Sequence, residues 1–213
     1  MIKLYQFDEL RPEEILNRDI RAEKNVEDVV DSILADVRAR GDAALKEYAL
    51  KFDGASIEEL QVTQAEIDEA FANMDPYFLE TLKEAAANIE AFHRQQVHKN
   101  FVVNDKPGIV LGQKYTPIEK AGVYVPGGTA AYPSTVLMDV IPAKVAGVSE
   151  IVMTTPAGQD GKVNPVILAA AATAGVTKIF KTGGAQAVAA LAYGTQTIPA
   201  VDKIVGPGNI YVA

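Results

Sequence analysis

The chain has 213 residues, of which 48% are hydrophobic and 23% are charged, and its formal net charge is −8. These values predict a globular protein of one or two domains, and the acidic balance argues against nucleic acid as a partner. Because cysteine is absent, disulfides and thiolate metal sites are excluded. The first residues lack the pattern of a signal peptide and the apolar runs are too short to span a membrane. We therefore expect a cytoplasmic protein with no membrane partner.

The first half of the chain is predicted to be mainly helical. Residues 1–24 are expected to form an arm with a short helix near 12–16 and no core of its own. Thr63 and Glu66 have the spacing of a capping box at the start of a helix. Within residues 25–120, apolar residues recur at helical spacing and predict helices over 26–39, 43–52, 64–73 and 75–96.

The pattern changes to alternation near Phe101. Three segments, 101–103, 109–111 and 115–118, have the period of β-strands and are separated by glycine-containing turns. They predict an antiparallel ribbon that leads to a domain boundary near Ala121.

Beyond this boundary, strands alternate with helices. This order is typical of a parallel sheet built from right-handed crossovers, so residues 121–213 are predicted to form an α/β domain. Ser134 is expected to cap the first of its helices. The predicted strands are 122–125, 150–154, 178–181 and 203–205, and the predicted helices are 134–146, 164–174 and 184–192.

Three glycine-containing breaks each follow an apolar run in this domain. Strand ends followed by glycines are where α/β proteins often bind nucleotides, and the three breaks together predict one site. Tyr124, Gln186 and Asn209 lie beside the breaks and are neutral donors and acceptors, suited to holding a polar cofactor. The breaks are 126–128, 182–186 and 206–209.

No residue is predicted to be catalytic or to bind a metal. The sequence has no G-x-G-x-x-G motif, no nucleophile with a base and no paired carboxylates at convincing spacing. His93 and His98 are expected to be solvated or packing residues near a helix end. Asp139 is expected to be structural or solvated. Lys144 and Lys181 could contact a phosphate, but lone lysines at the ends of elements are expected to be surface charges.

Five sequence blocks resemble the histidinol dehydrogenase family, and their order and spacing agree with that family. The resemblance covers essentially the whole chain. The blocks are Gly122–Gly128, Pro133–Met138, Pro142–Gly147, Gly183–Ala187 and Val205–Asn209.

The resemblance implies a fold of paired, incomplete Rossmann-like domains, similar to aldehyde dehydrogenases. It implies NAD-dependent, two-step oxidation of L-histidinol to L-histidine through an aldehyde, the last step of histidine biosynthesis, by a homodimer with zinc. The family's NAD contacts fall on Tyr124, Gln186 and Asn209. Residues 121–213 would thus be the Rossmann-like NAD-binding domain, and residues 25–120 the helical part of the first domain, which is incomplete here.

The chain departs from the family in length. The family's chain is about twice as long, and its zinc ligands and its Glu-His general acid and base lie beyond residue 213. We therefore expect a fragment without the catalytic half. Two alternatives remain, namely a non-catalytic nucleotide-binding or dimerising module, and a sister dehydrogenase acting on another hydroxymethyl substrate.

Overall fold

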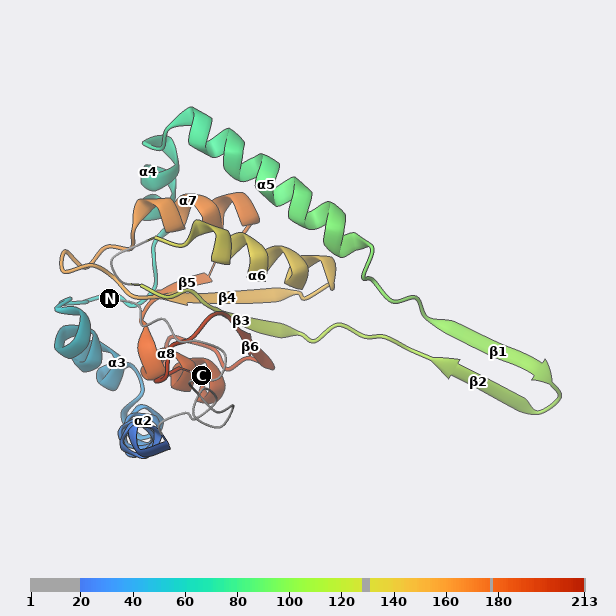
Figure 1. The fold of residues 1–213 in the computed structure, drawn as a ribbon, viewed down its shortest axis with the longest axis horizontal. Helices are drawn as coiled ribbons and strands as arrows, with labels where there is room; N and C mark the ends of the chain where they lie inside the picture. The colour runs from blue at the N-terminus through green and yellow to red at the C-terminus, as the bar shows by residue number, and fades with distance from the viewer. Residues whose placement is uncertain (1–19, 128–130, 177, 213) are drawn as a thin grey trace, which may run out of the picture.

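A four-stranded parallel sheet in the order β5-β4-β3-β6 forms the centre of the molecule (Figure 1). This computed structural model describes residues 20–127, 131–176 and 178–212. The predicted α/β fold, with a parallel sheet and an antiparallel pair, is confirmed. The strands of the sheet are β3 (Lys120–Tyr124), β4 (Glu150–Thr155), β5 (Lys178–Lys181) and β6 (Lys203–Val205).

Helices cover both faces of this sheet, which is why its strands are almost continuously apolar. Val123, Val152 and Ile179 are fully buried. The helices α6 and α7 lie on one face and α8 on the other (Figure 1). Their bounds are α6 Pro133–Val145, α7 Pro165–Ala174 and α8 Gly184–Tyr193.

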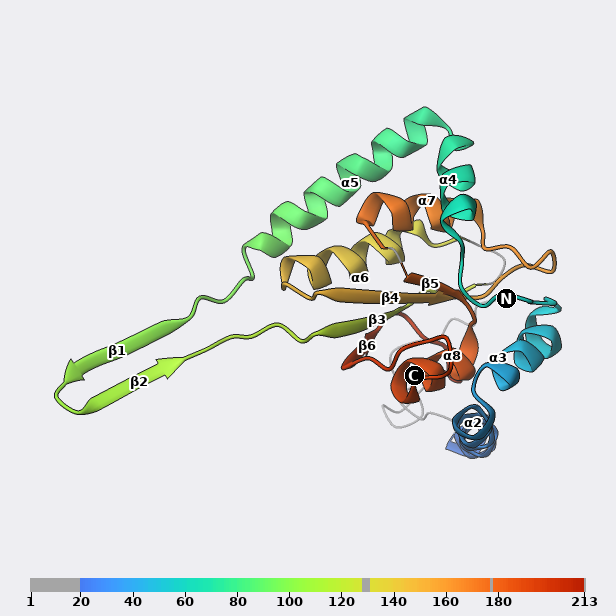
Figure 2. The ribbon, with the colours of Figure 1, turned by 180° about the vertical axis from the view of Figure 1, so that it is seen from behind.

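The earlier helices add an outer layer to each face. α2 and α3 pack on α8, whereas α4 and α5 pack on α7 and α6 (Figure 2). Ile33 and Val37 of α2 therefore share a buried cluster with Leu191 of α8. The predicted division near residue 120 stays a prediction, although side chains from both sides of it form common clusters. The bounds are α2 Ile20–Arg40, α3 Asp42–Tyr48, η1 Ala49–Asp53, α4 Gln64–Ala72 and α5 Pro76–Arg94.

Several predicted helix ends differ from the structure. The first helix begins by Ile20 rather than Val26, and the second continues from α3 into the π-helical turn η1. Ser134 is not the cap of α6, because Pro133, which needs no N–H acceptor at that position, already occupies the first turn. The short helix expected near 12–16 lies outside the described residues.

An antiparallel ribbon of two strands, β1 (Phe101–Lys106) and β2 (Ile109–Gln113), projects from the body. The third predicted strand, 115–118, is wrong, since these residues form no strand. Pro117 has no N–H to donate, and the N–H of Tyr115 is instead bound by the Asn100 side chain at 2.6 Å. In the described part of the chain, no helix is long and apolar enough to cross a membrane.

Residues 60–62, just before α4, pair with the outer edge of β5. The N–H of Val62 donates to the Ile179 carbonyl at 2.8 Å, and the N–H of Lys181 donates to the Leu60 carbonyl at 2.7 Å. This antiparallel pairing closes the free edge of β5. It also brings α4 within reach of the end of β5.

Lys181 and Glu66 form an ion pair at this junction, at 2.7 Å. Lys181 is 8% exposed, so the expectation of a surface charge is wrong. Burial acts to raise the pKa of Glu66, but hydrogen bonds from Lys181 and from Thr63 in the capping box outweigh it and hold the pKa below its usual value. The pair therefore ties the start of α4 to the sheet.

We predict that Lys181→Met lowers the free energy of unfolding by about 3 kcal/mol at neutral pH, because it leaves the Glu66 carboxylate largely buried without its partner. Lys178→Met is the matched control, since Lys178 lies on the same strand and pairs with Glu150, but its side chain is 44% exposed. That change is expected to cost less than about 1 kcal/mol. Urea unfolding followed by circular dichroism measures both, and equal losses would contradict the prediction.

The effect of Lys181→Met should depend on pH. Because the folded-state pKa of Glu66 is lowered, its ionisation stabilises the fold above the unfolded-state pKa of about 4.3. This contribution is lost as the pH falls through the folded-state pKa. The difference between wild type and Lys181→Met should shrink below about pH 4, and a constant difference would show that the charge of Glu66 plays no part.

Candidate functional site

The sheet order places a switch point between β3 and β6. From β3 the chain moves outward through β4 to β5, and then returns to the other side of β3 to form β6. In open parallel sheets, ligands bind at the carboxyl ends of the strands where the order reverses in this way. Tyr124 is the last residue of β3 and lies at this edge.

Tyr124 connects β3 to the first turn of α8. Its side chain is 5% exposed, and its hydroxyl oxygen accepts a hydrogen bond from the N–H of Gly184 at 3.2 Å. Burial raises the pKa of Tyr124, the Gly184 hydrogen bond opposes that rise, and the nearby charge of Asp53 adds to it. The phenol is therefore a neutral, fixed group at ordinary pH.

Gln186 lies in the same first turn of α8 and is 3% exposed. Its side chain folds back over Gly184, where a Cβ would be 2.8 Å from Gln186 Oε1. Gly184 also has φ of 63°, which favours glycine. Because the first N–H groups of a helix have no acceptor within it, this turn presents backbone donors beside the Gln186 amide.

The end of β6 contacts β3 at the same place. A Cβ on Gly206 would be 2.1 Å from the Tyr124 carbonyl oxygen, so the two backbones touch. Asn209 follows three residues later, is exposed, and accepts a hydrogen bond from the N–H of Tyr211 at 3.0 Å. The structure thus joins Tyr124 directly to the turn of Gln186 and to the end of β6, whereas Asn209 lies farther along the chain in a surface turn.

The second glycine break packs on the first through a proline. A Cβ on Gly127 would be 2.1 Å from Pro156, and one on Gly183 would be 2.9 Å from the same ring. Glycine at both positions lets the loops after β3, β4 and β5 meet. Gly128, predicted as part of the first break, lies outside the described residues.

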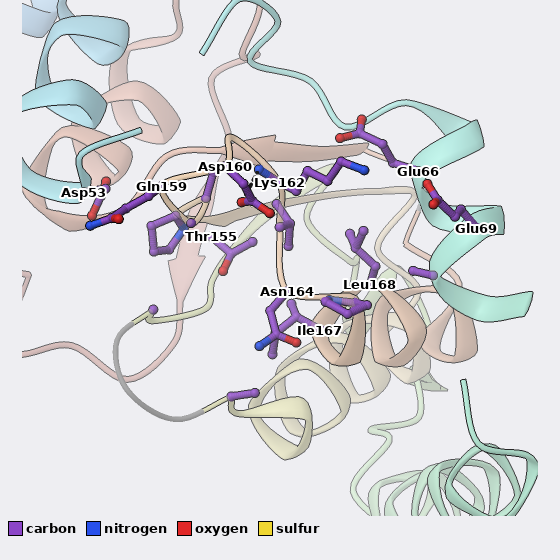
Figure 3. Close-up of a pocket in the computed structure, with 18 of the residues that line it drawn as sticks. Asp53, Glu66, Glu69, Thr155, Gln159, Asp160, Lys162, Asn164, Ile167 and Leu168 are labelled. Carbon is purple, nitrogen blue, oxygen red and sulfur yellow. Dashed lines mark hydrogen bonds between the residues drawn. The ribbon is translucent and has the colours of Figure 1, made fainter. Parts of the chain in front are cut away.

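A cavity of about 700 Å³ opens beside these loops (Figure 3). Carboxylates come from η1 (Asp53), α4 (Glu66, Glu69) and the loop after β4 (Asp160), and burial raises the pKa of Asp53. The sequence analysis named Glu66 only as part of a capping box and did not predict that these carboxylates share a cavity, because they come from three separated segments. Further polar residues of the wall are Asn73, Gln159, Lys162 and Asn164.

Two threonine hydroxyls near this edge are buried without a hydrogen-bond partner. They belong to Thr154, the last residue but one of β4, and Thr182, directly after β5. Together with the Gln186 amide and the Tyr124 hydroxyl, which accepts from the Gly184 N–H, the set consists of neutral donors and acceptors. It fits a polar, multiply hydrogen-bonded cofactor better than a reaction that moves protons.

The two histidines lie at a different place, beside a second cavity of about 650 Å³ near the base of the ribbon. His93 Nδ1 is 2.7 Å from Gln96 Oε1, and His98 stacks on Tyr115. Asp139 also borders this cavity. Its Oδ2 is buried without a partner, and burial raises the pKa of Asp139. No group of three or more metal-binding side chains occurs among the residues that the structure describes.

Comparison with known proteins gives a consistent result. The sequence profile described as histidinol dehydrogenase matches residues 16–213. A histidinol dehydrogenase of Chlorobaculum tepidum is 54% identical over 215 residues, covering 100% of this chain and 50% of the relative. One of Geobacillus kaustophilus is 58% identical over 181 residues, covering 85% of this chain and 43% of the relative.

A crystal structure of histidinol dehydrogenase from Elizabethkingia anophelis is also similar, with a TM-score of 0.84 and 37% sequence identity. The match covers 92% of this chain and 48% of that one. The chain therefore spans about half the length of the relatives that it matches.

We predict that Gly206→Ala lowers the free energy of unfolding by about 1 kcal/mol more than Gly108→Ala. Both glycines have positive φ, 141° and 78°, so both substitutions carry backbone strain. Only at Gly206 would the new Cβ meet another atom, the Tyr124 carbonyl oxygen, because nothing lies within 4 Å of a Cβ at Gly108. Denaturant unfolding of the two variants measures the difference, and equal losses would show that β6 is not held against Tyr124.

Proposed function

Because the chain belongs to the histidinol dehydrogenase family, we propose that it is the NAD-binding part of an enzyme that oxidises L-histidinol to L-histidine in two NAD-dependent steps. The observation that carries the proposal is the contact of Tyr124 with the first turn of α8, where Gln186 lies. When bound, NAD accepts the hydride from the substrate. The role of this chain's residues is to bind and orient that cofactor.

The charges at the edge of the sheet favour one arrangement of the cofactor. The cavity carries four carboxylates and, among its wall residues, Lys162, so it would repel a pyrophosphate. The start of α8 offers the N–H groups that follow Gly184 and the positive end of a helix dipole, which attract one. We therefore place the pyrophosphate near Gly184, with Gln186 and Asn209 as amide contacts.

The cavity carboxylates then have a natural role toward sugar hydroxyls. In dinucleotide-binding folds an acidic side chain accepts hydrogen bonds from a ribose. Asp53 lies near enough to Tyr124 to influence its pKa and also borders the cavity. It is therefore our candidate for a ribose contact between the two parts of the site.

The resemblance places the zinc ligands and the Glu-His pair in the half of the relatives that this chain does not match. Accordingly, we propose that this chain alone binds NAD, but neither holds zinc in equal amount nor oxidises L-histidinol. The homodimer implied by the resemblance is part of the proposal. A biosynthetic activity on a small amino alcohol also agrees with the cytoplasmic location expected from the sequence.

We predict that Gln186→Ala weakens NAD binding about five- to tenfold, the loss of roughly one hydrogen bond to the cofactor. Tyr124→Phe should also weaken it, because the first turn of α8 loses the hydrogen bond that holds it against the end of β3. Gln95→Ala and Tyr77→Phe are matched controls at exposed positions on or beside α5. Isothermal titration calorimetry with NAD measures all four, and unchanged affinity in both site variants would contradict the assignment.

The proposed reaction is tested by adding the half of a relative that this chain does not match. Co-expression of this chain with the complementary half of the Chlorobaculum tepidum relative should give NADH formation from L-histidinol that requires both parts. Association of the halves without NADH formation from L-histidinol would favour a sister dehydrogenase with another substrate. If this chain does not bind NAD at all, the proposed function is wrong.

A further inference from the structure

The helix α3 begins beside a residue that has no side chain with which to cap it. Its N-cap is Gly41, so no local side chain accepts a hydrogen bond from the first turn. The N–H of Asp42 instead donates to Gln196 Oε1 at 2.8 Å, although the two residues are 154 positions apart. The first turn of α3 is therefore capped by the loop that follows α8.

A second residue of this loop binds the same turn. The hydroxyl of Thr197 donates to the Asp42 carboxylate, and the N–H of Thr197 donates to Asp42 Oδ1 at 3.4 Å. Asp42 thus donates through its backbone to one residue of the loop and accepts through its side chain from the next. We call these contacts of Asp42 with Gln196 and Thr197 the α3 cap.

The segments on both sides are shaped to form the α3 cap. A Cβ on Gly41 would be 2.2 Å from Gln196 Oε1, and φ of Gly41 is 57°, so only glycine leaves room for the amide without backbone strain. In the loop, the Thr195 hydroxyl accepts from the N–H groups of Thr197 and Ile198. Ile198 is fully buried and anchors the loop in the core. The loop is therefore fixed in the shape that presents its polar side chains to α3.

The α3 cap joins two elements whose opposite ends reach the proposed cofactor site. α8 begins at Gly184, beside Tyr124 and Gln186, and ends just before the loop. α3 continues directly into η1, which ends at Asp53. Asp53 borders the cavity of about 700 Å³, and its charge acts on Tyr124 (Figure 3). Contacts thus lead from Tyr124 through α8, the α3 cap and η1 back to the neighbourhood of Tyr124.

Hydrogen bonds add a constraint on α3 that its apolar packing does not supply. Leu45 and Tyr48 of α3 share a buried cluster with Leu191 of α8. Apolar contacts hold the two helices together, but they are not directional, so they resist sliding along the helix axis only weakly. The hydrogen bonds of the α3 cap are directional and fix the end of α3 along that axis. Because α3 and η1 form one continuous helical segment, a shift at this end also moves Asp53.

We propose that Gln196 and Thr197 are positioning residues for the cofactor, which hold Asp53 in place through the first turn of α3. They act through Asp53 and do not touch the cofactor themselves. The inference rests on the proposed function, in which Asp53 contacts a ribose of NAD. It adds two residues at the opposite end of α8 from the Gln186 turn.

The test is a double-mutant cycle in which isothermal titration calorimetry measures the affinity of this chain for NAD. Asp53→Ala should weaken binding about five- to tenfold, the loss of roughly one hydrogen bond. Gln196→Ala/Thr197→Val should weaken it about three- to fivefold, because the contact is displaced rather than removed. When the two changes are combined, the second should cause no further loss, since the group that it positions is absent.

A matched control and a conservative variant separate positioning from a general loss of stability. Gln113→Ala/Thr81→Val makes the same two kinds of substitution at exposed hydrogen bonds on β2 and α5, and it should leave NAD affinity unchanged. Thr197→Val alone should weaken binding and lose this effect when Asp53→Ala is also present. Thr197→Ser keeps the hydroxyl and should retain the wild-type affinity. The single variants also keep the test decisive if the double variant does not fold.

Two results would overturn the inference. Equal losses from the cap variant in the wild-type and Asp53→Ala backgrounds would show that the α3 cap does not act through Asp53. Wild-type affinity in the folded cap variant would show that it positions nothing at the site. The proposed function is tested separately, because a loss of affinity in Gln186→Ala but not in Asp53→Ala would keep the NAD site and remove only the roles of Asp53 and the α3 cap.

Discussion

The position of β3 between β4 and β6 is the constraint on which the rest of the structure depends. β3 is hydrogen-bonded on both sides, so its register fixes the heights at which the neighbouring strands end. It also carries Gly122, where a Cβ would be 3.0 Å from Leu191 of α8 and from Val201. Because that glycine lets α8 lie close on the sheet, the first turn of α8 can reach the Tyr124 hydroxyl.

Much of this core could be predicted from sequence. Strands and helices that alternate over 121–213 leave a strong local pattern, since each apolar run ends at a glycine or proline. The same pattern led to Tyr124 and Gln186, and the Tyr124 hydroxyl accepts a hydrogen bond from Gly184, two residues before Gln186. The family resemblance rested on these blocks as well, and the comparisons support it over the whole chain.

The features that the sequence analysis missed are those with no local pattern. Segment 60–62 joins the sheet through only a few hydrogen bonds and lies more than a hundred residues from its partner strand. Lys181 was predicted to be a surface charge because its ion-pair partner, Glu66, is equally distant in sequence and leaves no local pattern. The cavity carboxylates come from separate elements, and segment 115–118 showed alternation without an available partner strand.

The π-helical turn η1 has a consequence for the charge beside Tyr124. A π-turn contains one residue more than an α-helical turn, so it shifts the angular phase of every side chain after it. Asp53 is the last residue of η1, so the direction of its side chain is set by the extra residue of the π-turn rather than by a regular α-helix. Gly54 then ends the turn in the left-handed conformation. The electrostatic neighbourhood of the Tyr124 phenol is thus set in part by the backbone conformation of η1, an element outside the sheet.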